Sequence, residues 1–296
     1  MPIWRILALA GCCLAFLGAR GDGTAASEAF LKAARDAYGT PAYASYTNTL
    51  VKNFLPAKTV RADVPMAGGS ILWKEVEGMR NVRDLGGWTG LATGRVFRGS
   101  EPDCLPPEKA LKKPKGKYHD LNVTPKGLQT IRGDLKIKTD LDLRAASECP
   151  HPETSAFGEN VNLVRVPLSA YGKAFTQTNE YARALRVFAD PANYPVYFHC
   201  WGGADRTGTI ALILEGLCGV SETDCAIDYE LTSFAAVFGT RSRVKGHSFF
   251  KIASVIKKLK TYPGATFADQ VESYMKTTLG LSSDEIDRIR RQLMIR

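Results

Sequence analysis

The best candidates for reactive residues are a cysteine and an arginine six positions apart, in the segment His199-Cys-Trp-Gly-Gly-Ala-Asp-Arg-Thr-Gly208. An apolar run at 195–198 precedes Cys200 and another follows Arg206, which predicts a strand, a tight loop and a helix. Backbone N–H groups of such a loop and the helix N-terminus converge on one point and favour an anion there. The same positive field lowers the pKa of a thiol, so we expect a thiolate near neutral pH.

The remaining residues of this loop are typical of a phosphate cradle. Gly202 and Gly203 permit the backbone conformations that a cradle needs. The planar fork of Arg206 can hold two phosphate oxygens, and the Thr207 hydroxyl can stabilise the thiolate. We expect His199 to orient the loop by hydrogen bonding. The residues predicted to contact phosphate are Trp201, Gly202, Gly203, Ala204, Asp205, Arg206 and Thr207.

This segment resembles the H-C-x5-R-[ST] signature of cysteine-dependent protein tyrosine and dual-specificity phosphatases. The chain is most similar to the atypical bacterial tyrosine phosphatases with lipid phosphatase activity, over residues 76–296. Further segments that carry the resemblance are Asn81-Val-Arg-Asp-Leu-Gly-Gly87, Phe97-Arg-Gly-Ser100, Asp140-Leu-Asp-Leu-Arg144, Asp228-Tyr-Glu-Leu-Thr232 and the C-terminal 279–290.

The resemblance implies a two-step displacement that needs no metal and no other cofactor. Cys200 attacks phosphorus to form a phosphocysteine while a general acid protonates the leaving oxygen, and water then hydrolyses the intermediate. The family's closest members take this acid from the Asp-Leu-Arg strand end, which matches Asp142 here. Asp205, inside the loop, is the alternative. We prefer Asp142 because it lies at the end of a predicted parallel strand, and the carboxyl ends of such strands line the binding site in folds of this type.

Supporting roles are expected for three further residues, and one position departs from the family. Asp84 and Arg98 are expected to brace the site as a buried ion pair or to act in catalysis, and Arg144 to be structural or to bind substrate. Close relatives carry Lys where this chain has Ala204, which disfavours highly phosphorylated lipids. Candidate replacements for that charge are Arg144, Arg241, Arg243 and Lys245, and candidate pocket walls are Tyr171 and Phe175.

Strand and helix signals alternate from about Val76 onward. They predict an α/β fold with a mainly parallel central sheet flanked by helices, as in cysteine phosphatases, together with an N-terminal extension. Strands are expected at 95–98, 137–143, 161–166 and 195–199; helices are expected at 125–133, 179–188 and 207–218, and after the capping patterns at Ser221 and Ser282.

The N-terminal residues suggest export. Residues 1–19 are predicted to be an export signal, either cut near Ala19 or cut before Cys12, which would then carry lipid and tether the protein to a membrane. Residues 20–75 are predicted to be an extension packed on the phosphatase domain, 76–296. Beyond the signal five cysteines remain of seven. Pairing of Cys218 with Cys225 and of Cys104 with Cys149 would leave Cys200 free.

The composition places limits on function. The net charge of +9 favours acidic partners, but no aromatic-interleaved basic motif predicts nucleic-acid binding. We therefore predict an exported, metal-independent phosphatase, which would be periplasmic, secreted or lipid-anchored. Its expected partner is a phosphorylated protein or a small phosphomonoester, with phosphotyrosine favoured. Phosphoserine or phosphothreonine, phosphoinositides and inositol phosphates are alternatives, as is a phosphate-binding module that has lost turnover.

Overall fold

The computed structural model describes residues 74, 76–86, 88, 90–105, 122–232 and 249–295. The predicted export signal, nearly all of the extension 20–75, and the candidate basic residues Arg241, Arg243 and Lys245 lie outside the described residues. No helix in the described ranges is long and apolar enough to cross a bilayer.

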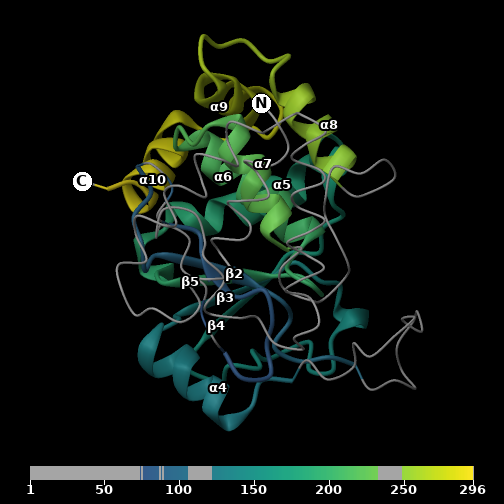
Figure 1. Cartoon of the computed structure of the whole chain (residues 1–296), viewed down its shortest axis with the longest axis vertical. Coiled ribbons are helices and arrows are strands. Elements are labelled where there is room, and N and C mark those ends of the chain that lie inside the picture. Colours follow the sequence, from purple (N-terminus) through teal and green to yellow (C-terminus); the bar gives the residue numbers. More distant parts are fainter. Residues whose placement is uncertain are drawn as a thin grey trace, which may run out of the picture.

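A five-stranded sheet of order β1-β2-β5-β3-β4 forms the centre of the fold (Figure 1). Strand β1 pairs antiparallel with β2, and every other neighbouring pair is parallel. The predicted mainly parallel sheet is therefore confirmed. The strands are β1 (Arg83–Asp84), β2 (Val96–Gly99), β3 (Thr139–Asp142), β4 (Asn162–Arg165) and β5 (Val196–His199).

Helices cover the sheet on both faces, as Figure 1 shows, with α4 on one side and α6, α7, α9 and α10 on the other. The helices are α4 (Pro125–Gln129), α5 (Thr178–Arg186), α6 (Asp205–Leu217), α7 (Glu222–Leu231), α8 (Phe249–Leu259), α9 (Phe267–Thr277) and α10 (Ser283–Leu293). A π-helical turn, η3 (Thr130–Asp134), continues α4. Short 3-10 turns are η4 (Ala146–Glu148), η5 (Tyr171–Phe175), η6 (Val187–Ala189) and η7 (Pro191–Asn193).

The central strand β5 has no polar face, because apolar residues cover it on both sides. Val196 and Phe198 belong to the larger core cluster, which includes α6 and α10. The intervening Tyr197 belongs to the smaller cluster near α4. A strand buried on both faces is a near-continuous apolar run, as the sequence of β5 is.

Local signals fix the helix ends where the sequence predicts them. The Thr124 hydroxyl caps α4 by accepting from the Gly127 N–H at 3.2 Å. Ser282 and Glu285 form a reciprocal capping box at the start of α10. Helix α6 ends before Gly219, whose φ of +86° is left-handed, a conformation that favours glycine after a helix.

Neither of the two disulfide pairings considered from the sequence is formed: Cys218 is not bonded to Cys225, nor Cys104 to Cys149. Cys225 lies inside α7, where its Sγ donates to the Val220 carbonyl at 3.7 Å. Cys149 contacts the Ala145 carbonyl at 3.3 Å. Burial raises the pKa of Cys218 to about 12 and that of Cys149 to about 12, so these thiols pack as neutral core groups.

Candidate active site

The segment 200–206, called here the phosphate loop, joins the end of β5 to the start of α6. Parallel β2 and β3 flank β5, and their ends lie level with His199. The site therefore occupies the carboxyl edge of the sheet, where ligands of such folds bind. Helix α6 begins at Asp205, so its free N–H groups face the loop.

Cys200 is buried and is nevertheless an acidic thiol. Burial alone would raise the pKa of Cys200, but the Arg206 guanidinium and hydrogen bonding from Thr207 outweigh it and lower that pKa below its ordinary value. The Thr207 hydroxyl is itself fully buried and has no other hydrogen-bond partner among the described residues. The adjacent thiolate is the acceptor that this hydroxyl can serve.

Arg206 is held in place by a carboxylate that the sequence analysis missed. Its Nη1 and Nη2 bind the two oxygens of Glu148 at 2.8 and 2.9 Å, and Nη1 also donates to the Leu143 carbonyl at 3.2 Å. This fork-to-fork pair fixes the plane of the guanidinium beside Cys200. Glu148 lies 58 positions before Arg206, so no local spacing could have indicated it.

Two buried side chains pull loop carbonyls away from the site. Asn81 Nδ2 donates to the carbonyls of Gly202 and Gly203 at 3.1 and 3.0 Å. Arg98 Nη2 donates to the Gly203 carbonyl at 3.0 Å. Gly203 has a φ of +63°, and a Cβ there would lie 2.2 Å from the Gly99 carbonyl oxygen. With these carbonyls turned outward, the loop can direct its N–H groups inward to an anion.

A buried ion-pair network supports Asn81 and Arg98 from below. Asp228, in α7, binds Arg83 Nε at 3.0 Å and also pairs with Arg98 Nη1. Arg83 in turn contacts the Asn81 side chain at 2.5 Å. All four side chains are almost completely buried. Their link to the phosphate loop makes this network a scaffold for it.

Asp84 does not pair with Arg98, so the predicted ion pair between them is wrong. Its carboxylate accepts instead from the N–H groups of Gly86 and Gly94, the first at 2.8 Å. Arg98 is already occupied by Asp228. Asp84 therefore stabilises the connection between β1 and β2, which is a structural role.

His199 lies beneath the loop as expected. Its Nε2 is 2.9 Å from Asp140 Oδ1 on the neighbouring strand β3. Burial would lower the pKa of His199, but the charges of Asp142 and Asp140 raise it above the ordinary value. The ring thus ties β5 to β3 directly under Cys200.

Asp142 ends β3, where the sequence predicted it, yet its surroundings do not suit a proton donor. Its carboxylate binds Arg144 Nε at 3.0 Å and Nη2 at 2.9 Å, and Arg165 Nη2 at 2.9 Å. Burial would raise the pKa of Asp142, but the charges of His199 and Arg144 hold it well below its ordinary range. At neutral pH this carboxylate carries no proton to give.

Arg144 is fully occupied by protein groups. Besides Asp142, it binds Glu101 Oε2 at 2.8 Å, the Asp103 carbonyl at 2.7 Å and Asp103 Oδ1 at 2.8 Å. Of the two roles expected for it, this geometry fits the structural one. Burial raises the pKa of the neighbouring Glu101 to about 9 despite Arg144.

Asp205 is placed differently, at the first position of α6 inside the phosphate loop. Its Oδ1 contacts the Tyr171 hydroxyl, and the Tyr229 hydroxyl lies 3.3 Å from the same oxygen. The two tyrosine hydroxyls are 2.7 Å apart. Tyr171 therefore lies at the site, whereas Phe175 stacks against Tyr262 and packs in the core.

Comparison with known proteins fits this geometry. The sequence pattern of the tyrosine phosphatase family matches residues 74–295. The chain belongs to this family. A "putative tyrosine-protein phosphatase" of Cupriavidus necator is 28% identical over 180 residues, which are 50% of this chain and 59% of that relative. A tyrosine-protein phosphatase of Nostoc commune is 24% identical over 202 residues, 54% of this chain and 67% of that one.

This tyrosine phosphatase family member thus spans about three fifths of the length of the Cupriavidus relative that it matches. A solved structure, the core catalytic domain of the PP-IP phosphatase SIW14 from S. cerevisiae in complex with citrate, is 19% identical with a TM-score of 0.37. That match covers 69% of this chain and 96% of the yeast chain.

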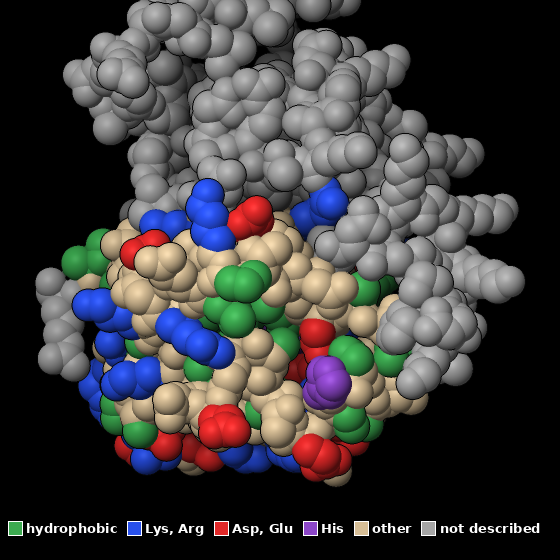
Figure 2. All heavy atoms as spheres, turned by 90° about the horizontal axis from the view of Figure 1, so that it is seen from below, with side chains coloured by type: hydrophobic (Ala, Val, Ile, Leu, Met, Phe, Trp, Pro, Cys, Tyr) green, Lys and Arg blue, Asp and Glu red, His purple; other side chains and the backbone are tan. Residues whose placement is uncertain are grey.

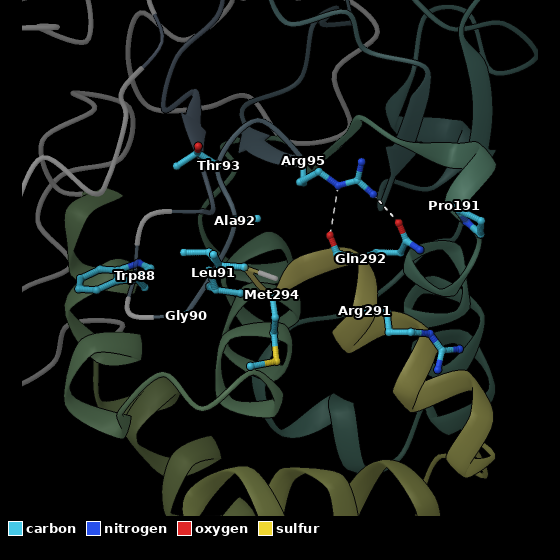
Figure 3. Close-up of a pocket in the computed structure, with 11 residues that line it drawn as sticks. Trp88, Gly90, Leu91, Ala92, Thr93, Arg95, Pro191, Arg291, Gln292 and Met294 are labelled. Carbon is cyan, nitrogen blue, oxygen red and sulfur yellow. Dashed lines mark hydrogen bonds between the residues drawn. The ribbon is translucent and has the colours of Figure 1, made fainter.

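Away from the phosphate loop, this family member has a cavity of about 840 Å³ lined by residues that include Leu91 and Met294 (Figure 3). Arg95, just before β2, lines it and donates through Nε to the Gln292 carbonyl at 3.1 Å. The face viewed from the α4 end carries basic and acidic side chains interspersed (Figure 2). The described side chains on this face do not form the continuous basic stripe typical of a nucleic-acid binder.

Proposed function

We propose that the chain hydrolyses phosphomonoesters through a phosphocysteine on Cys200. The observation that carries this proposal is the acidic, buried thiol at the focus of the phosphate loop, with the Arg206 guanidinium fixed beside it. A thiolate is the nucleophilic form of cysteine. A loop that binds an oxyanion next to a thiolate is suited to phosphoryl transfer, which depends on positioning and on charge stabilisation.

The first step breaks the phosphorus–oxygen bond of the ester. The Cys200 sulfur attacks phosphorus, and Arg206 with the inward N–H groups of the loop stabilises the equatorial oxygens. Asp205 gives its proton to the leaving oxygen. We assign the acid to Asp205 rather than Asp142, because Asp205 lies in the phosphate loop itself, whereas Arg144 and Arg165 keep the Asp142 carboxylate ionised.

The second step breaks the sulfur–phosphorus bond. Asp205, now ionised, takes a proton from water, and the oxygen of that water attacks phosphorus. Inorganic phosphate leaves, and the thiolate is restored with help from the Thr207 hydroxyl. His199 and the Asn81–Arg98 scaffold hold the loop in one conformation through both steps.

Phosphotyrosine is the substrate class that we favour. Both curated relatives are named as tyrosine-protein phosphatases. Tyr171 and the half-buried Trp201 place aromatic surface at the loop, which suits an aryl phosphate. Inositol phosphates are less favoured, because Ala204 supplies no charge and Arg144 is occupied by protein carboxylates. Action outside the cytoplasm is proposed from the N-terminal export pattern alone.

The test is hydrolysis of para-nitrophenyl phosphate by the purified chain with a chelator and a reductant present, beside Cys200→Ser. We expect turnover that survives the chelator and is lost in the variant. A phosphotyrosine peptide should then be turned over with a higher kcat/KM than phosphoserine peptides or inositol phosphates. Activity that persists in Cys200→Ser, or that requires a metal, would refute the proposal.

A further inference from the structure

We propose that Tyr171 is a positioning residue for the general acid, holding one carboxylate oxygen of Asp205 so that the catalytic proton resides on the other. This inference rests on the proposed function, in which Asp205 protonates the leaving oxygen. The contacts that carry it join three separate elements, η5, α6 and α7.

The three groups form a closed triangle. Tyr171 Oη touches Asp205 Oδ1, Tyr229 Oη touches Tyr171 Oη at 2.7 Å, and Tyr229 Oη lies 3.3 Å from Asp205 Oδ1. Both hydroxyls thus approach the same oxygen of the carboxyl group. An oxygen that accepts from hydroxyl donors is a poor place for a proton of its own, so protonation is directed to Oδ2.

The backbone of Tyr171 is also held in place beside α6. Its φ of +61° is left-handed, which is uncommon for a residue with a large side chain. Its N–H donates to the Thr209 hydroxyl at 3.0 Å, and that hydroxyl donates to the Asp205 carbonyl at 2.8 Å. Tyr171 is therefore joined to the first turn of α6 through both its backbone and its side chain. Such strained conformations persist where the surrounding structure imposes them, often at functional sites.

The segment η5 is itself fixed by packing, so Tyr171 has a rigid base. Ala174 is fully buried, and its carbonyl accepts from the Tyr274 hydroxyl at 2.6 Å. Phe175 packs between Tyr262 and Tyr274. Burial, with the neighbouring Tyr229 and Asp205, raises the pKa of Tyr171 far above its ordinary value. Its hydroxyl consequently stays protonated and remains a donor throughout the working pH range.

The experiment compares leaving groups that need the acid to different degrees. Kinetics with para-nitrophenyl phosphate and with phenyl phosphate are measured for the full chain and for Tyr171→Phe. Nitrophenolate leaves readily without a proton, whereas phenolate needs one. We expect Tyr171→Phe to lower kcat on phenyl phosphate roughly tenfold more than on the nitrophenyl ester, a loss within the range of general acid catalysis. Asp205→Asn should show the same pattern more strongly.

The matched control is Tyr262→Phe, which also removes one hydroxyl. Tyr262 packs on Phe175 of the same segment, but its hydroxyl binds Thr278 at 2.7 Å, away from Asp205. We expect the kcat ratio of the two substrates to stay as in the unmodified chain. Tyr229→Phe should change the ratio less than Tyr171→Phe, because its hydroxyl lies farther from Oδ1.

The outcomes separate this inference from the function on which it rests. Equal losses on both substrates in Tyr171→Phe, or no change in the ratio, would overturn the positioning role while Cys200→Ser remains inactive. If Asp205→Asn lowers kcat equally on phenyl phosphate and on the nitrophenyl ester, the assignment of the acid is overturned, and the positioning role with it. Activity in Cys200→Ser would overturn the proposed function itself.

Discussion

Replacing Asp228 by Asn should destabilise the fold strongly, because this carboxylate is the partner of two buried arginines. Arg83 Nε binds Asp228 Oδ1 at 3.0 Å, and Arg98 Nη1 binds Oδ2. Both arginine side chains are 0% exposed, and Asp228 is 2% exposed. Removing one partner of a buried pair leaves an uncompensated charge and typically destabilises by about 3–5 kcal/mol. For a domain of this size that loss lowers Tm by roughly 6–20 °C.

The assay is thermal and denaturant unfolding of Asp228→Asn beside Asp284→Asn. Asp284 also pairs with an arginine, Arg288, at 3.3 Å, but it is 70% exposed. An exposed pair of this kind contributes about 0–1 kcal/mol, so Asp284→Asn should leave Tm nearly unchanged. Equal, small effects of the two substitutions would refute the view that the Asp228 network carries the phosphate loop.

Three further outcomes are expected. Thr207→Val should raise the pH midpoint of Cys200 alkylation by iodoacetamide, since hydrogen bonding by Thr207 helps to lower the pKa of that thiol. Peptide mass spectrometry measures the extent of alkylation at each pH. An unchanged midpoint would contradict stabilisation of the thiolate by Thr207. Glu148→Gln should lower kcat/KM about tenfold on any phosphomonoester, because the Arg206 fork loses a charge-assisted partner; full activity would contradict the pairing. Burial opposes ionisation of Asp228, but Arg83 and Arg98 hold its pKa below the ordinary value. The stabilisation by this carboxylate is therefore present above about pH 4 and is lost as pH falls through the folded pKa. The free energy of unfolding, measured against pH in the acid range, should consequently change less steeply for Asp228→Asn than for the unmodified chain.

Local patterns allowed most of the central fold to be predicted. The alternation of strand and helix signals, the Thr124 and Ser282 caps and Gly219 all describe interactions within a few residues, and the structure places them as expected. The cysteine thiols show the limit of this reasoning. Pairing Cys218 with Cys225 rested on nearness in sequence and on an assumed oxidising compartment, whereas both are unbonded, buried thiols of the same core cluster and Cys225 Sγ contacts the Val220 carbonyl instead.

The part of the site that lies in one contiguous segment could be predicted from the sequence. The phosphate loop, Arg206 and Asp205 are contiguous, so their proximity followed from the spacing. Glu148 joins Arg206 across 58 positions, and Tyr171 joins Asp205 across 34. Contacts between residues so far apart along the chain produce no local pattern from which they could be predicted. Asp142 was correctly placed at a strand end, but its arginine partners, which decide its protonation, become evident only from side-chain geometry.

A covalent phosphocysteine on Cys200 is the intermediate on which the proposed function depends. The most direct measurement is rapid denaturation of Asp205→Asn during turnover of para-nitrophenyl phosphate, followed by digestion and peptide mass spectrometry. Loss of the base slows hydrolysis of the intermediate more than its formation from this leaving group, so the peptide that contains Cys200 should gain the mass of one phosphoryl group. A phosphoryl group on any other residue, or turnover without an adduct, would contradict the claim.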